Sequence, residues 1–203
     1  LCFGDSNTWG AIPDKSERFP ADKRWTGVLQ KELGYKYEII EEGLDARTTN
    51  IDDVDHLSEL RNGAKYLVPC LNSHIPLDYV ILFLGTNDLK ARYNKSPEQI
   101  IEGVEELIKI ILHMEYIHET IPPKIILIAP PLINDNEESL RGKFLGAEAK
   151  SKLLGQLYSD LASKYDLPFL DLSKIFPAMG HLNESAHQTL GELIAKKILG
   201  LKD

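Results

Sequence analysis

The sequence predicts a single α/β domain in which a parallel sheet of about five strands is covered by helices on both faces. Five short apolar or β-branched runs, typical of buried strands, alternate with longer segments of helical periodicity. The chain has 203 residues, 43% of them hydrophobic and 27% charged, which is enough for one substantial core. No internal repeat, low-complexity tract or linker interrupts it, so we expect residues 1–203 to form one three-layer α/β/α sandwich.

The apolar runs are the predicted strands of this sheet. Strands that alternate with helices are joined by right-handed crossovers, which makes the sheet parallel and places helices on both of its faces. The predicted strands cover residues 1–3, 37–40, 79–84, 124–129 and 168–170.

Helical periodicity predicts the connecting helices over residues 24–33, 63–72 and 147–164, the second of which is interrupted by Pro69. Ser96 starts the helix with the clearest signal, because a proline follows at the first helical position and Gln99 stands at the capping-box position. We expect this helix to run to about His118.

The last predicted helix begins after Asn183, a residue type typical of helix N-caps, and runs to Leu199 with leucine and isoleucine at helical spacing. The one long connection is the polar stretch from Asn134 to Lys143. Two interpretations of it remain open, a plain surface loop, which we favour, and a cover over an active site.

Composition excludes several classes of function. The formal charge of -8 and the isoelectric point near 5.3 argue against a nucleic-acid-binding surface, which needs clustered Lys and Arg. No apolar run approaches the ~18 residues of a membrane helix, and no secretory signal precedes the first strand. We therefore expect no membrane partner and a cytoplasmic location.

The sequence predicts neither a metal nor a cofactor. Cys2 and Cys70 give neither a disulfide framework nor a spacing such as C-x-x-C, so we expect two reduced core thiols. His181 and His187 are six residues apart, which on a helix places them on different faces and disfavours chelation. A nucleotide- or flavin-binding module is disfavoured because neither G-x-x-x-x-G-K-[ST] nor G-x-G-x-x-G is present.

Conspicuous polar or glycine residues follow four of the predicted strands. Ser6 follows the first, Gly43 the second, Asn87 the third, and His181 lies beyond the fifth. The carboxyl ends of parallel strands lie along one edge of a sheet, so residues far apart in the chain are expected to converge in one crevice.

These residue types suit acyl transfer. Ser6 is the candidate nucleophile and His181 the base that activates it and later returns the proton to the leaving alcohol. The backbone N–H groups of Ser6 and Gly43 and the side-chain amide of Asn87 are candidate oxyanion donors.

Four neighbouring residues are expected to support this constellation. Asp5 and Asp88 are predicted to hold their turns by local hydrogen bonds. Trp9 either lines the acyl pocket or packs in the core, and Arg47 is predicted to tie loops together by ion pairs.

The blocks Gly4-Asp5-Ser6, Gly43, Gly85-x-Asn87-Asp88 and His181 resemble those of the SGNH (GDSL-type) hydrolase family, and residues 41–49 and 76–88 resemble its bacterial arylesterase and acyltransferase branch. The resemblance implies a flavodoxin-like fold and hydrolysis of small acyl esters through an acyl-enzyme. It also implies the roles given above to Ser6, Gly43, Asn87 and His181, and an ability to form a homo-oligomer.

One position departs from the family pattern. The family has an aspartate three residues before the histidine, which orients the imidazole, and here that position is Ala178. Three explanations stay open: residues are missing between Phe176 and His181, another carboxylate substitutes, or the protein works as a Ser-His dyad. Asp171 and Glu184 are nearby carboxylates, but neither has the expected spacing.

The sequence therefore predicts a serine esterase for short-chain or aryl esters that can also pass the acyl group to an alcohol, since both reactions share the acyl-enzyme. A carbohydrate O-deacetylase and a catalytically impaired relative that binds small molecules are the alternatives.

Overall fold

The computed structural model describes residues 1–54, 60–116, 121–138 and 140–201. Its centre is a five-stranded sheet of order β2-β1-β3-β4-β5 in which all neighbouring strands are parallel. This is the order of flavodoxin-like folds, so the predicted fold class is confirmed. The strands are β1 (Cys2–Gly4), β2 (Glu41–Gly43), β3 (Tyr79–Phe83), β4 (Lys124–Ala129) and β5 (Phe169–Asp171).

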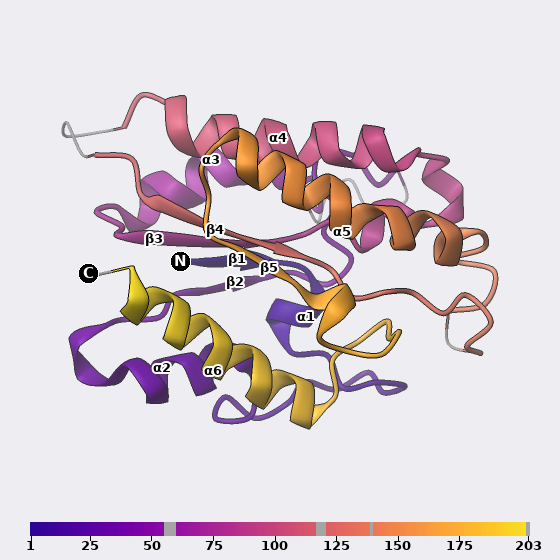
Figure 1. Ribbon diagram of the computed structural model, residues 1–203, viewed down its shortest axis with the longest axis horizontal. Coiled ribbons are helices and arrows are strands. Elements are labelled where there is room, and N and C mark those ends of the chain that lie inside the picture. Colours follow the sequence, from indigo (N-terminus) through magenta and orange to yellow (C-terminus); the bar gives the residue numbers. More distant parts are fainter. Residues whose placement is uncertain (55–59, 117–120, 139, 202–203) are drawn as a thin grey trace.

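Helices cover both faces of the sheet (Figure 1). One face carries α3 (Gly63–His74), α4 (Pro97–His113) and α5 (Ala147–Lys164), and the other carries α2 (Trp25–Leu33) and α6 (Glu184–Gly200). Alternate strand residues feed the two cores, as with Leu82 on the α4 side and Ile81 on the α6 side. Among the described helices, none is long and apolar enough to cross a membrane.

The predicted helix starts are confirmed. Ser96 and Gln99 form the capping box of α4, and the Asn183 side chain accepts a hydrogen bond from the Ala186 N–H at the start of α6. α4 ends at His113, short of the predicted end at His118, which lies outside the described residues.

Pro69 lies inside α3 and does not end it. The helix continues to His74 because Leu67, Cys70 and Leu71 bury one face in the core, while Pro69 lies on the exposed face. Burial of this face outweighs the hydrogen bond that proline removes.

The predicted second strand at residues 37–40 is wrong, since the strand lies at Glu41–Gly43. The Gln30 side chain on α2 donates to the Tyr37 carbonyl at 2.9 Å and accepts from the Ile39 N–H at 3.0 Å. These side-chain bonds satisfy backbone groups that a strand would otherwise pair with its neighbour. The apolar run therefore packs beside the sheet edge, and β2 begins after it.

Buried His187 gives the stability of the fold a pH dependence. Its Nδ1 accepts from the Trp25 N–H at 3.2 Å, and burial lowers its pKa to about 4, from 6.5. Above pH 6.5 the imidazole is neutral in both folded and unfolded chains, so its stabilisation is complete. Between pH 6.5 and about 4 only the unfolded chain takes up the proton, which costs about 1.4 kcal/mol of stability per pH unit.

We therefore expect His187→Asn, which keeps an acceptor for Trp25, to be less sensitive to acid than the wild type. The measurement is the free energy of unfolding from urea melts between pH 4 and 7, taken as the difference between the two proteins so that other titrating groups cancel. Parallel pH profiles would contradict the assignment.

Candidate active site

The structure brings Ser6 and His181 together. Ser6 is the first residue of the short helix α1 (Ser6–Trp9), which follows β1 directly, and His181 lies in the loop before α6. The His181 Nε2 is 3.1 Å from the Ser6 Oγ. This is hydrogen-bond distance, so the imidazole is placed to take the hydroxyl proton.

A cavity of about 470 Å³ opens on this pair. Its volume falls in the range of small-molecule sites. Trp9 and Asn87 contribute to its wall, as do residues that the sequence did not single out. These are Ala11, Lys15, Ser16, Asp45, Ala46, Thr86, Lys90, Leu140, Lys143, Phe144 and Gly180.

The long polar connection takes part in this wall, so the favoured interpretation of it as a plain surface loop is wrong. Leu140 and Phe144 are both buried, and together with Lys143 they line the cavity. Leu140 within the polar stretch and Phe144 directly after it are the apolar residues that were the sequence signal for this role. Leu140 and Phe144 thus contribute apolar surface to the cavity wall.

Asp5 connects the helix that carries Ser6 to Asn87. Its Oδ1 caps α1 by accepting from the Asn7 N–H at 2.9 Å, and its Oδ2 is 3.4 Å from the Asn87 Nδ2. Asn87 also donates to the Arg47 carbonyl at 3.1 Å. Complete burial raises the pKa of Asp5 to about 7, against the lowering effect of the Asn7 N–H. These bonds hold the Asn87 amide on the cavity wall.

Gly43 allows β2 to approach α1 closely. A Cβ on Gly43 would lie 2.1 Å from the backbone nitrogen of Trp9, so no side chain fits between the strand and the helix. Gly43 pairs in register with Gly4, next to the turn that carries Ser6. Its neighbours Asp45 and Ala46, rather than Gly43 itself, form that part of the cavity wall.

Arg47 ties the ends of β1 and β2 together, by carbonyl contacts rather than by the ion pairs we expected. Its guanidinium donates to the Gly4 carbonyl at 3.0 Å and to the Glu42 carbonyl at 2.5 Å. It also lies 4.3 Å from the centre of the Phe3 ring. Arg47 is buried, and its guanidinium holds the ends of the two strands together.

Asp88 joins the loops that follow β3 and β2. Both carboxylate oxygens accept from the Thr49 N–H at 3.1 Å, and the Thr49 hydroxyl donates at 2.5 Å. Burial raises the pKa of Asp88 to about 6, while the Thr49 hydrogen bonds lower it. Its main partner thus lies in the neighbouring loop instead of its own turn.

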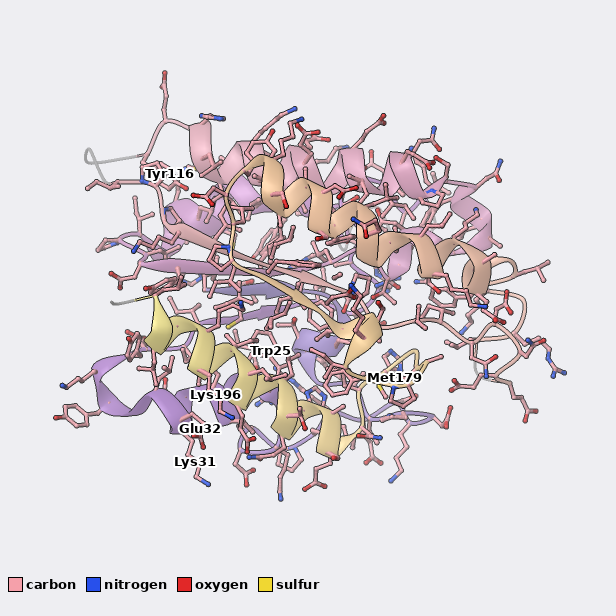
Figure 2. The ribbon with its side chains drawn as sticks, in the orientation of Figure 1. Trp25, Lys31, Glu32, Tyr116, Met179 and Lys196 are labelled. Carbon is pink, nitrogen blue, oxygen red and sulfur yellow. The ribbon has the colours of Figure 1, made fainter. Side chains whose placement is uncertain are left out.

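Asn7 is the positioning residue that sequence reasoning missed. Its Oδ1 accepts from the Leu182 N–H at 2.9 Å and its Nδ2 is 3.4 Å from the Gly180 carbonyl, so it holds the backbone on both sides of His181. Figure 2 shows Met179 on the same loop, at the end of the sheet where α1 lies. Adjacency to Ser6 was its only signal in the sequence.

Ala178 occupies the place expected for the triad acid, and neither nearby candidate replaces it. The Asp171 carboxylate accepts from Ser173, and the Glu184 carboxylate pairs with Lys23. In the part of the chain that the structure describes, no carboxylate is hydrogen-bonded to His181. Ala178 is exposed and shares with His181 the wall of a second cavity, of about 310 Å³.

Electrostatics favour the neutral form of His181. Burial lowers the pKa of the imidazole, and the negative charges of Asp45, Glu137 and Asp14 oppose this effect. Because burial is the larger effect, the imidazole is unprotonated at neutral pH and available as a base.

Comparison with known proteins finds relatives that are esterases. Residues 2–190 match the family model described as GDSL-like Lipase/Acylhydrolase family. The chain is 41% identical to the native aryl esterase of M. smegmatis, with a TM-score of 0.91 over 98% of this chain and 97% of that chain. It is 38% identical to a carbohydrate acetylesterase from Sinorhizobium meliloti, with a TM-score of 0.89 over 98% and 97% of the two chains. No curated protein matched the chain.

Proposed function

Because the chain belongs to the GDSL-like lipase/acylhydrolase family, we propose that this carboxylic ester hydrolase is a serine esterase for short-chain or aryl esters. The observation that carries the proposal is the 3.1 Å contact between the Ser6 Oγ and the His181 Nε2 on the wall of a cavity of about 470 Å³. A homo-oligomer and a cytoplasmic location stay predictions.

In the first half-reaction the Ser6 Oγ attacks the ester carbonyl while its proton passes to the His181 Nε2. The tetrahedral intermediate collapses, the bond to the alcohol breaks, and the alcohol leaves with that proton. In the second half-reaction water attacks the acyl-enzyme in the same way and releases the acid. An alcohol in place of water gives acyl transfer, which the proposal includes.

The oxyanion needs donors aimed at it before it forms. In our proposal the Ser6 N–H at the start of α1 and the Asn87 Nδ2, which belong to residues of the cavity wall, take this role. Gly43 is not among the residues of that wall, so a role for its N–H stays a prediction. One Asn87 hydrogen is held by the Arg47 carbonyl at 3.1 Å. The contact of the other with Asp5 is long, at 3.4 Å, so this hydrogen is the one available to the oxyanion.

Carbohydrate O-deacetylation is the second candidate, and the polar part of the cavity favours it. Asp45, Lys90 and Lys143 line the wall beside the apolar Trp9 and Phe144. Charged side chains of this kind can hydrogen-bond to sugar hydroxyls, whereas the aromatic side suits an aryl leaving group.

Steady-state hydrolysis of p-nitrophenyl acetate and of an acetylated sugar by the purified protein tests both candidates. A higher kcat/KM for the aryl ester supports the arylesterase, and the reverse supports the deacetylase. Turnover of neither would reject both and indicate the catalytically impaired relative.

Ala178→Asp tests whether the histidine lacks an orienting acid. A complete triad loses about 10⁴-fold in kcat when its acid becomes an amide. We expect a carboxylate added next to an unadapted histidine to recover part of this, raising kcat about 10-fold or more. It should also raise the pKa of His181, so the acid limb of kcat/KM, which we place below pH 6.5 in the wild type, moves to higher pH.

The matched control is Ala178→Asn, which has the same size without the charge and should leave both kcat and the limb near wild type. If Ala178→Asp changes neither quantity, another group already orients His181.

A further inference from the structure

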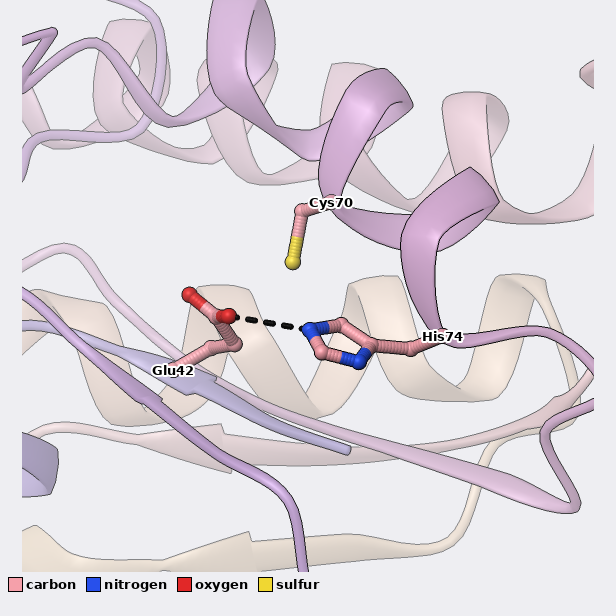
Figure 3. Close-up of side chains that lie close together, drawn as sticks. All are labelled: Glu42, Cys70 and His74. Atoms are coloured by element: carbon pink, nitrogen blue, oxygen red, sulfur yellow. Dashed lines mark hydrogen bonds and ion pairs between the residues drawn. The ribbon is translucent and has the colours of Figure 1, made fainter.

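A cysteine, a histidine and a glutamate lie together on the α3 side of the sheet edge, away from the cavity at Ser6. Cys70 and His74 are four residues apart on α3, so their side chains share one face of the helix. Glu42 on β2 lies opposite them, and its Oε1 is 3.0 Å from the His74 Nε2 (Figure 3). One ligand atom from each of the three residues lies within 4.8 Å of the other two.

We propose that Glu42, Cys70 and His74 form a binding site for Zn²⁺ or a similar borderline-soft divalent cation. Thiolate, imidazole and carboxylate are the ligand types that Zn²⁺ takes in proteins, at about 2.0 to 2.3 Å from the metal. Ligand atoms that already lie within 4.8 Å of one another need only small side-chain rotations to reach these distances. Three protein ligands leave the fourth tetrahedral position for water.

The protonation balance of the site is simple. Burial raises the pKa of the Cys70 thiol to about 12, and the Glu42 charge acts in the same direction, so without a cation the thiol stays protonated. Binding replaces the thiol proton by the metal and releases one H⁺ per ion. The Glu42 carboxylate and the Cys70 thiolate then match the two positive charges of the ion.

The surroundings of the cluster organise it and leave it accessible. Tyr66, one helical turn before Cys70, donates its hydroxyl to the Glu42 Oε2 at 3.3 Å and so holds the carboxylate toward α3. The Arg47 guanidinium, 5.1 Å from the Tyr66 ring, is a nearby positive charge that weakens cation binding. His74 lines a cavity of about 630 Å³ at this edge of the sheet, which gives an ion a path to the imidazole.

The site lies one residue from the contact between β2 and α1. Glu42 is followed by Gly43, whose backbone packs on α1 beside Trp9. An ion coordinated by the Glu42 side chain therefore restrains the part of β2 that packs on the helix carrying Ser6.

Titration of the reduced, metal-free protein with Co²⁺, a coloured substitute for Zn²⁺, tests the site without using esterase activity. We expect one Co²⁺ per chain, a thiolate-to-metal charge-transfer band in the near ultraviolet, release of one proton, and loss of the band on addition of Zn²⁺. Cys70→Ser should abolish the band. Glu42→Gln and His74→Ala should each weaken binding by at least about ten-fold.

Two matched controls separate this site from the other described side chains of the same types. Cys2→Ala removes the other cysteine, and His113→Ala removes an exposed histidine that ends α4 as His74 ends α3. Both should bind Co²⁺ as the wild type does. Absence of the band in the wild type, a band that survives Cys70→Ser, or unchanged affinity in His74→Ala would each overturn the assignment. If Cys70→Ser fails to fold, the Co²⁺ affinity of His74→Ala decides, because His74 is partly exposed and its loss disturbs the core less.

Discussion

Ser6→Ala lowers kcat for p-nitrophenyl acetate by about 10²-fold. In a complete triad, loss of the serine costs about 10⁶-fold in kcat and loss of the acid alone about 10⁴-fold. An enzyme that already lacks the acid therefore has about 10²-fold left to lose with its serine. A larger loss would show that another group in this chain orients the His181 imidazole in place of the missing acid.

The Ser6→Ala chain should fold normally, since the hydrogen bond to the His181 Nε2 is the side-chain contact that the change removes. Thermal unfolding checks this. Ser163→Ala, on an exposed turn of α5, is the matched control and should keep wild-type turnover. Turnover that persists in folded Ser6→Ala would remove Ser6 from the mechanism.

Asn87→Ala lowers kcat by about 10² to 10³-fold with little change in KM, because the amide is proposed to bind the oxyanion and not the ground-state ester. Steady-state kinetics with p-nitrophenyl acetate give both constants. Asn87→Asp keeps the shape but replaces the donor by a negative charge, so its loss should be at least as large. A rise in KM at constant kcat would instead make Asn87 a substrate-binding residue.

Local signals were sufficient to predict most of the fold. The Ser96 capping box and the Asn183 cap depend on neighbouring residues only, and both helices start where these signals place them. The second strand failed because its place is decided by a tertiary contact. The Gln30 side chain takes the backbone groups of Tyr37 and Ile39, and nothing within the apolar run reveals this.

The candidate site, like the fold, has residues that the sequence could predict and residues that only tertiary contacts reveal. Ser6, Asn87 and His181 could be placed together because each follows a strand at the carboxyl edge of a parallel sheet. The Asn7 contacts on both sides of His181 could not be foreseen, since they join residues more than 170 positions apart. For the cation site, the spacing of Cys70 and His74 is visible in the sequence, but Glu42 joins them only through the packing of α3 on β2.

In the proposed mechanism Ser6 forms the covalent intermediate. Reaction of the protein with a serine-directed phosphonate, followed by intact mass measurement and peptide mapping, shows which residue is the nucleophile. We expect one adduct per chain, located on Ser6 and absent from Ser6→Ala. An adduct on another residue, or equal labelling of Ser6→Ala, would contradict it.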